Sequence, residues 1–130
     1  MSVVLSNPAT VAQPDGQFSQ AVLVNMPTNL LFISGQVPRD LDGKTVGKGN
    51  MTAQAEQVFR NLGAILQAHG TDFTKAIKAT IFVTDMSLAE EVTAVRKRFY
   101  GSSAPASTFV EVRALGDSDW MLEIELIAAI

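Results

Sequence analysis

Residues 76–85 read AIKATIFVTD, and this stretch decides how the rest of the chain is arranged. One side of it carries aliphatic residues and the other mostly polar ones, which predicts a strand with one buried face. The aliphatic side consists of Ile77, Ala79, Ile81 and Val83. Segments with helical spacing precede the strand at 51–69 and follow it at 88–100. Two amphipathic helices cover only one face of a sheet, so the stretch predicts an α+β fold with both helices on that face.

The apolar residues of the first helical segment recur at steps of three and four, which places them on one face. They are Met51, Ala55, Val58, Leu62, Ile65 and Leu66. Asn50 is positioned to cap the start of this helix and Gly70 to end it. In the second segment, Ser87 followed three residues later by Glu90 predicts a capping box, and Gly101 predicts the end of the helix.

Four further strands are predicted, two before the first helix and two after the second. The first pair, 20–25 and 30–34, is separated by Met26-Pro27-Thr28-Asn29, which suits the turn of a hairpin. The second pair, 107–115 and 120–129, is joined by residues 116–119. The order is therefore β-β-α-β-α-β-β in a single domain over residues 1–130, whose first sixteen residues we expect to run over the surface as an arm.

The sheet face away from the helices is predicted to have a mixed character. If the last two strands pair around a turn near Asp117, their odd-numbered residues share that face with alternate residues of 76–85. It then holds Phe82, Phe109 and Ile127 among carboxylates and threonines. Such a surface is too apolar for solvent and too polar for the core of a monomer, so we expect it to be buried between subunits.

The composition excludes several kinds of function. The chain of 130 residues has no cysteine, which excludes disulfides and thiolate metal sites. Its net charge of −3 and scattered basic residues disfavour nucleic acid as a partner, because phosphate binding needs a basic face. No apolar run approaches the roughly 20 residues of a membrane helix, and no secretory signal is recognisable. We therefore expect a cytoplasmic protein that binds no membrane.

Two features of the sequence are suited to chemistry. Glu123 and Glu125 lie two residues apart on one predicted strand, so both carboxylates project from the same face about 7 Å apart. They can form a charged ladder with Arg113 on the neighbouring strand. Alternatively, one of them acts as an acid–base group in a partly enclosed pocket, where burial raises its pKa. The second feature is the break of an apolar strand at Ser34-Gly35, which either ends an ordinary strand or lets a ligand approach the backbone.

Short motifs are spread over nearly the whole chain. They are GQFSQA at 16–21, FISGQVP at 32–38, AQ at 53–54, TIFVTDM at 80–86, VEV at 110–112 and the segment 122–128. In this order they resemble the Rid family, the reactive intermediate deaminases that are also called YjgF or L-PSP endoribonuclease-like proteins. The resemblance implies a chorismate-mutase-like fold and a homotrimer whose sheet faces pack around a central barrel. It also implies a small-molecule pocket at each subunit interface.

In the active branch of that family, the pocket hydrolyses enamines and imines such as 2-aminoacrylate without a metal or cofactor. The resemblance implies that Glu123 orients the water and that Ser34 and Gly35 hold the ligand. This sequence also departs from the family pattern. Ser107 stands where relatives carry the arginine that binds the substrate carboxylate, Phe109 replaces a frequent cysteine, and Phe18 replaces a tyrosine.

These departures alter the expected ligand. A guanidinium–carboxylate pair contributes about 1.5–3 kcal/mol through charge-assisted hydrogen bonds, whereas the Ser107 hydroxyl offers one neutral donor. Arg113 lies roughly 20 Å along the strand, too far to substitute, and Arg39, in the loop after Pro38, is a candidate to swing in. A neutral or aromatic small molecule fits this lining better than a 2-imino acid.

Two classes of function remain open from the sequence. The first is an imine or enamine deaminase, a hydrolase, with altered specificity. The alternative is a non-catalytic trimer that binds a metabolite or another protein through the same cleft. A ribonuclease, as one family label suggests, is disfavoured by the acidic balance of the chain and its single histidine.

Overall fold

The computed structural model describes residues 2–10, 12–14, 16–25 and 29–130. Its elements are β1 (Ser2–Ser6), β2 (Ala21–Asn25), β3 (Leu30–Gln36), α1 (Met51–Ala68), β4 (Ala76–Val83), α2 (Ala89–Tyr100), β5 (Ala106–Glu111) and β6 (Leu122–Ala129), with 3₁₀ turns at Phe73–Lys75 and Met86–Leu88. From β2 onward this confirms the predicted order, and β1 is an additional strand within the predicted arm. None of the helices in these ranges is long and apolar enough to cross a membrane.

Helix α1 begins and ends close to the predicted positions. The Asn50 side chain accepts a hydrogen bond of 3.0 Å from the backbone N–H of Ala53. Gly70 follows the helix with φ +70°, a conformation that favours glycine. The buried face packs against the sheet and supplies much of the core; it consists of Met51, Gln54, Ala55, Val58, Phe59, Leu62 and Leu66.

Gln54 is the polar member of that buried face, and it fixes the start of β6. Its side-chain nitrogen donates to the backbone oxygens of Gly47 at 3.1 Å and Asp119 at 2.8 Å. Its side-chain oxygen accepts from the backbone N–H of Met121 at 2.8 Å. A fully buried amide is stable only when its groups are paired, and here the pairs hold both flanking loops against α1.

The start of α2 differs from the prediction. No side chain caps this helix at Leu88, so the expected capping box of Ser87 and Glu90 is wrong. Instead, the Asp85 carboxylate accepts hydrogen bonds from the Ser87 backbone N–H at 3.0 Å and the Ser87 hydroxyl at 2.6 Å. The hydroxyl is thus used in the 3₁₀ turn that leads into α2. Gly101 ends α2 as predicted, with φ +58°.

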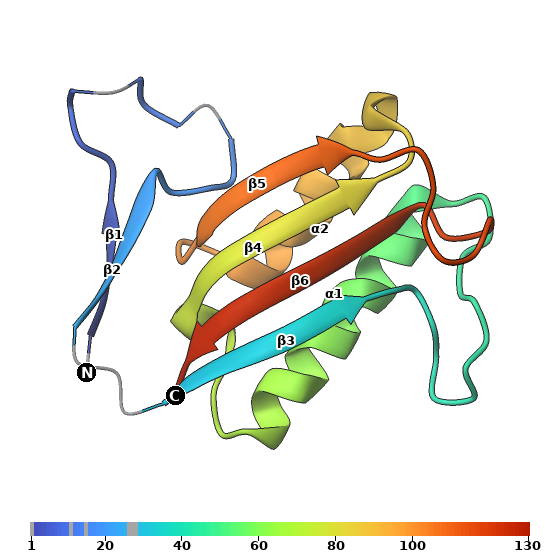
Figure 1. Ribbon diagram of the computed structural model, residues 1–130, viewed down its shortest axis with the longest axis horizontal. Helices are drawn as coiled ribbons and strands as arrows, with labels where there is room; N and C mark the ends of the chain where they lie inside the picture. Colours follow the sequence, from blue (N-terminus) through green and yellow to red (C-terminus); the bar gives the residue numbers. More distant parts are fainter. Residues whose placement is uncertain (1, 11, 15, 26–28) are drawn as a thin grey trace.

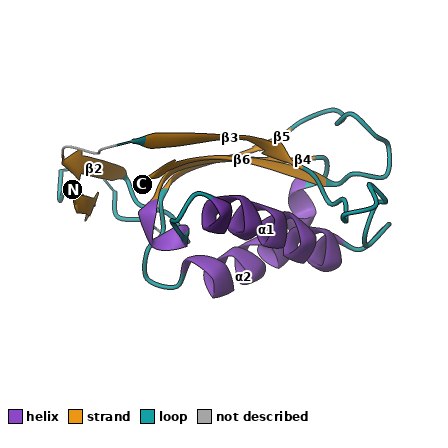
Figure 2. Ribbon diagram, turned by 90° about the horizontal axis from the view of Figure 1, so that it is seen from below, coloured by secondary structure: helices purple, strands orange, loops and turns teal. Residues whose placement is uncertain are grey.

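The main sheet has the strand order β3-β6-β4-β5 (Figure 1). Strand β6 runs antiparallel to β3 and β4, whereas β4 and β5 are parallel and are connected through α2. A parallel pair needs a long crossover, and α2 provides it. Figure 2 shows α1 and α2 on the same side of this mixed sheet, as predicted, so the other side has no helix on it.

The predicted hairpin between the last two strands is wrong, because β4 lies between β5 and β6. On β6, Leu122, Ile124 and Leu126 are at most 1% exposed. A strand this apolar is best buried in a central position with a partner on each side. Residues 112–121 are long enough to carry the chain past the end of β4.

This topology places Phe109 on the face opposite to the predicted one. In the parallel register Phe109 lies beside Ile81, which is fully buried beneath the helices, so Phe109 points toward α2. Phe82 and Ile127 lie on the helix-free face as predicted. Phe32, Ser34, Lys78, Thr80, Thr108, Glu123 and Glu125 share that face with them. Its mixed character is therefore confirmed, although one aromatic member was assigned to the wrong side.

The first two predicted strands do not form a hairpin with each other. Strand β2 pairs with β1, and β3 pairs with β6. Figure 1 shows β1 and β2 standing apart from the four-stranded sheet. The Ser19 backbone N–H and hydroxyl donate to the carbonyl oxygens of Pro105 at 2.9 Å and Ala104 at 2.6 Å, which attaches the start of β2 to that of β5. Residues 26–28 of the predicted turn lie outside the described residues.

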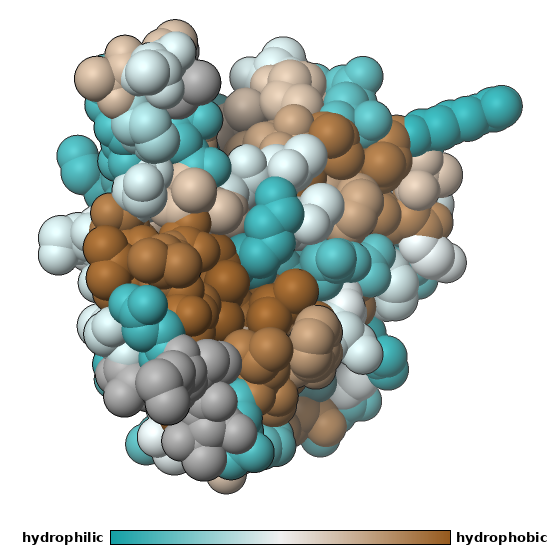
Figure 3. Space-filling view, turned by 60° about the vertical axis from the view of Figure 1, so that its left-hand side comes forward, coloured by the Kyte–Doolittle hydropathy of each residue, from teal (hydrophilic) through white to brown (hydrophobic). Residues whose placement is uncertain are grey.

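Apolar side chains gather on the side of the molecule where β1, β2 and the first residues of β3 lie (Figure 3). The large exposed apolar residues of these strands are Val4, Leu5, Leu23, Leu30 and Phe32. Phe32 is 69% exposed on the helix-free face of the sheet. Exposed apolar surface of this extent is typical of an interaction surface.

Candidate functional site

Glu123 and Gly35 lie side by side on the neighbouring strands β6 and β3. A Cβ atom added to Gly35 would overlap Glu123 Oε1 and stand 2.8 Å from Glu123 Cδ. The pairing of β3 with β6 is irregular between Ile33 and Gln36, where this close approach occurs. The lack of a side chain at position 35 thus permits a close approach to the backbone, one of the two alternatives that the sequence left open, and the group that approaches in the chain is the Glu123 carboxylate.

Ser34 is exposed on the same helix-free face. It lines a shallow hollow together with Phe32, Ile33, Lys78, Thr80, Glu125, Leu126 and Ile127. Within this hollow, Lys78 Nζ donates to Thr108 Oγ1 at 2.7 Å. The structure thus brings Glu123, Gly35 and Ser34 together at the β3–β6 side of the sheet.

The charged ladder offered as an alternative for Glu123 is wrong. Arg113 follows β5, which is not a neighbour of β6. Across the sheet, Glu123 has Phe82 beside it and Glu125 has Thr80. Among the described residues, neither glutamate takes part in an ion pair. The acid–base hypothesis for Glu123 therefore stays open, and the structural alternative to it is removed.

Phe18, Ser107 and Phe109 form a second group, at the opposite edge of the sheet. Ser107 lies beside Ala79 in the β4–β5 register, so it shares the α2 side of β5 with Phe109. Arg96 of α2 completes the group, since its Cζ lies 5.4 Å from the centroid of the Phe109 ring. A Cβ at Gly16 would stand 3.8 Å from the Phe18 ring and 3.9 Å from Arg96 Nη2, so the turn before β2 covers the guanidinium.

Arg96 is a buried cation that the sequence analysis did not single out. It is 5% exposed, and burial lowers its pKa, an effect that the nearby acidic groups Tyr100 and Glu90 oppose. Burial raises the pKa of the Tyr100 hydroxyl, and Arg96 counteracts that shift. A signal was present in the sequence: position 96 lies four residues after Val92 and four before Tyr100, on the apolar stripe of α2.

The six predicted site residues form two half-sites in one chain. Glu123, Gly35 and Ser34 lie towards the β3 edge, whereas Phe18, Ser107 and Phe109 lie at the β5 edge. Glu123 and β5 are two strand spacings apart, about 10 Å, and Phe109 faces the other side of the sheet. A ligand that touches both groups would therefore have to bind between two chains, and the pocket at a subunit interface stays a prediction.

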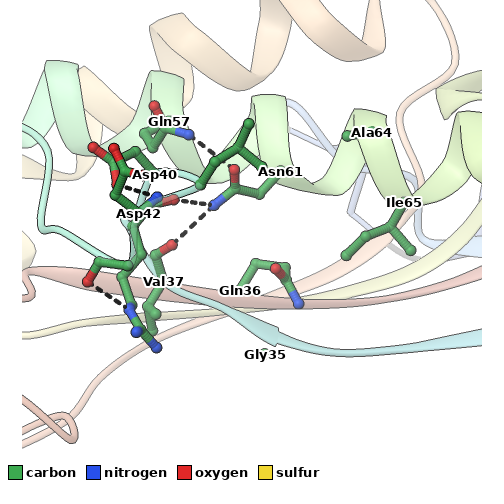
Figure 4. Close-up of a pocket in the computed structure, with 12 residues that line it drawn as sticks. Gly35, Gln36, Val37, Asp40, Asp42, Gln57, Asn61, Ala64 and Ile65 are labelled. Atoms are coloured by element: carbon green, nitrogen blue, oxygen red, sulfur yellow. Dashed lines mark hydrogen bonds between the residues drawn. The ribbon is translucent and has the colours of Figure 1, made fainter.

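Arg39, the candidate substitute cation, is held within its own loop. Its Nε donates to the carbonyl oxygen of Gly43 at 3.1 Å. The loop in turn is tied to α1 by Asn61, whose side chain donates to the backbone oxygens of Val37 at 3.2 Å and Arg39 at 2.9 Å (Figure 4). The hollow between this loop and α1 is lined by apolar residues as well as by these polar groups, and it lies on the β3 side of the sheet, far from Ser107.

A mixed sheet in this strand order, with two helices on one face, defines a chorismate-mutase-like α+β protein. Two solved structures share the arrangement. The Rid family protein YyfB of Yersinia pestis superposes with a TM-score of 0.91 at 29% identity, covering 100% of both chains. A putative endoribonuclease of Thermotoga maritima gives a TM-score of 0.74 at 35% identity, covering 98% of this chain and 97% of its own.

The sequence model of the endoribonuclease L-PSP family matches residues 9–130, and the chain belongs to this family, the Rid proteins. A RutC family protein of Pyrococcus horikoshii is 38% identical over 116 residues, covering 89% of each chain. The human 2-iminobutanoate/2-iminopropanoate deaminase is 34% identical over 113 residues, covering 87% of this chain and 80% of its own. The resemblance found in the motifs is thereby confirmed.

Proposed function

We propose that the chain forms a homotrimer in which a pocket at each subunit interface hydrolyses an enamine or imine to a carbonyl compound and ammonia. The observation that carries the proposal is the Glu123 carboxylate, which lies over Gly35 on a face that no helix covers. The relative named as an imine deaminase supports the reaction class. The exposed Phe32 and the mixed face around it support burial against other copies.

The proposed reaction needs one water molecule and two proton transfers. An enamine first tautomerises to the imine, whose carbon is electrophilic. Glu123 accepts a proton from the attacking water while its oxygen bonds to that carbon. Glu123 passes this proton to the nitrogen, which completes the carbinolamine. It then carries the proton of the carbinolamine hydroxyl to the amino group, the carbon–nitrogen bond breaks, and ammonia leaves as the carbonyl forms. The carboxylate returns to its starting state, so no other reactant is consumed.

The specificity differs from that of 2-aminoacrylate deaminases in this proposal. Ser107 cannot form the bidentate pair that an arginine forms with a carboxylate, and Phe18 and Phe109 add apolar rings to the same half-site. An aromatic substrate fits this lining. The same observation also favours the alternative, a trimer that binds such a molecule without converting it.

Ammonia release tests the proposal and separates it from the alternative. Two imine sources are compared, 2-aminoacrylate generated from serine by a dehydratase and an aromatic ketimine. We expect the protein to accelerate ammonia release from the aromatic imine more than from 2-aminoacrylate. A protein that accelerates neither reaction is a binding protein, and the enzyme proposal fails.

A further inference from the structure

Three buried polar atoms lack a hydrogen-bond partner among the described residues, two of them on α2 and one on β5. They are Arg96 Nε, Tyr100 Oη and Ser107 Oγ. Arg96 and Tyr100 are one helical turn apart on α2, and Ser107 lies on the side of β5 that faces this helix. Buried polar groups are rarely left unpaired, so the cluster points to a missing partner.

The Arg96 guanidinium is the strongest of these groups. It is planar and always charged, and it carries five N–H donors. In the described part of the chain it forms no ion pair and no hydrogen bond, although its residue is only 5% exposed. The Phe109 ring at 5.4 Å provides a cation–π contact. Such a contact does not replace the hydrogen bonds that the buried N–H groups lose.

The surroundings of the guanidinium restrict what its partner can be. One side is formed by Phe109, and the turn at Gly16–Phe18 lies against Nη2. The acidic groups whose charge acts on Arg96, Glu90 and Tyr100, both lie on its own helix, and neither is paired with it. The charge therefore has no anionic partner among the described residues, and a small anion with an apolar body would meet the two phenylalanine rings beside it.

We infer that Arg96 binds the anionic group of the ligand and takes over, from α2, the role of the arginine that Ser107 replaces on β5. The inference rests on the proposed function in that it concerns the same half-site. A carboxylate matches the planar guanidinium fork with two parallel hydrogen bonds, and the Ser107 hydroxyl can donate to the same group. The ligand class is a small aromatic or branched carboxylate.

Benzoate and benzamide test this directly, because they have nearly the same shape and differ in charge. Their dissociation constants are measured by calorimetry for the wild-type protein, Arg96→Met and Lys97→Met. Lys97 is the adjacent, exposed cation of α2 and serves as the matched control. We expect Arg96→Met to weaken benzoate binding by at least about tenfold, as loss of a charge-assisted pair does. Lys97→Met should leave benzoate binding unchanged, and neither substitution should change benzamide binding.

A second measurement is made on the wild-type protein and does not depend on the folding of Arg96→Met. In the wild-type protein, the Nε–H resonance of Arg96, assigned by its disappearance in Arg96→Lys, should shift when benzoate is added and stay in place with benzamide. The inference is overturned if the wild-type protein binds benzoate no more tightly than benzamide, or if the resonance does not move. It is also overturned if Arg96→Met weakens only subunit association, since a carboxylate of another copy is then the partner.

The outcomes separate this inference from the proposed function. Benzoate binding that depends on Arg96, without any imine hydrolysis, rejects the enzyme and keeps the anion site. If the protein hydrolyses imines but binds benzoate equally well with and without Arg96→Met, the anion site is rejected and the enzyme proposal is kept.

Discussion

Gly35 lies beneath the carboxyl group of Glu123, in a space that any side chain at position 35 would occupy. The contact joins the irregular part of β3 to the second residue of β6. It holds the carboxylate over the backbone of the neighbouring strand. The position of Glu123 therefore depends on the lack of a Cβ atom at position 35.

Substitution of Gly35 by alanine should therefore damage activity more than stability. The added Cβ would meet the flexible end of the Glu123 side chain, which can move aside, so we expect a change in unfolding free energy of no more than about 1–3 kcal/mol. The displaced carboxylate should reduce imine hydrolysis by about 10²-fold, as misplacement of a reacting group by 1 Å does. Urea unfolding and ammonia release measure the two effects.

A double-mutant cycle checks the cause of that loss. If Gly35→Ala acts only by displacing Glu123, it should have no further effect on the rate in a Glu123→Ala background. Additive losses in the cycle would show that Gly35 contributes to ligand binding by itself.

Glu123 and Glu125 form a natural pair of test and control. Both project from the same face of β6, but only Glu123 lies over Gly35, and Glu125 is exposed beside Thr80. We expect Glu123→Gln to lower the turnover rate by about 10²–10⁴-fold, the usual contribution of a general base. Glu125→Gln should leave the rate close to that of the wild-type protein. Equal losses in the two variants would mean that the negative charge of the face matters, rather than proton transfer.

The helices could be predicted from the sequence because their signals are local. The spacing of apolar residues and the Asn50 and Gly70 boundaries fix α1 without reference to the rest of the chain. The strands from β2 onward were found for the same reason, but their partners were not. A hairpin is the default for consecutive strands, and here β6 enters between β3 and β4 because it has the most apolar residues to bury.

The same distinction applies to the site. The Ser34-Gly35 break left open an ordinary strand end or the approach of a ligand, and in the structure the group that lies against Gly35 is the Glu123 carboxylate. Phe109 was assigned to the wrong face because its orientation depends on parallel pairing with β4. Arg96 was overlooked among the scattered basic residues, although its position on the apolar stripe of α2 marks it as buried.

The proposed assembly can be tested at Phe32. This side chain is 69% exposed on the helix-free face, and burial of a phenylalanine contributes about 1.5–3 kcal/mol. Phe32→Lys loses that contribution in every subunit and adds a charge to the interface, so we expect a monomer in analytical ultracentrifugation where the wild-type protein is a trimer. Leu41→Lys is the control, because Leu41 is fully exposed in a loop. A wild-type monomer at micromolar concentration would contradict the proposal.

The Asp85 turn predicts a pH dependence of stability. Hydrogen bonds from the Ser87 hydroxyl and then from its backbone N–H lower the pKa of Asp85 in the folded chain. The carboxylate is thus favoured in the folded state, and its contribution to stability is present above the unfolded pKa of about 3.9 and is lost as the pH falls through the lower folded value. Asp85→Asn should melt below the wild-type protein at pH 7, and the difference should close between pH 4 and pH 2. Thermal unfolding across that range measures the difference in melting temperature. In a Ser87→Ala background this difference should be smaller at pH 7, because the hydroxyl that is the main cause of the Asp85 pKa shift is gone. A difference that persists unchanged at pH 2 would assign the effect to shape or packing instead of charge.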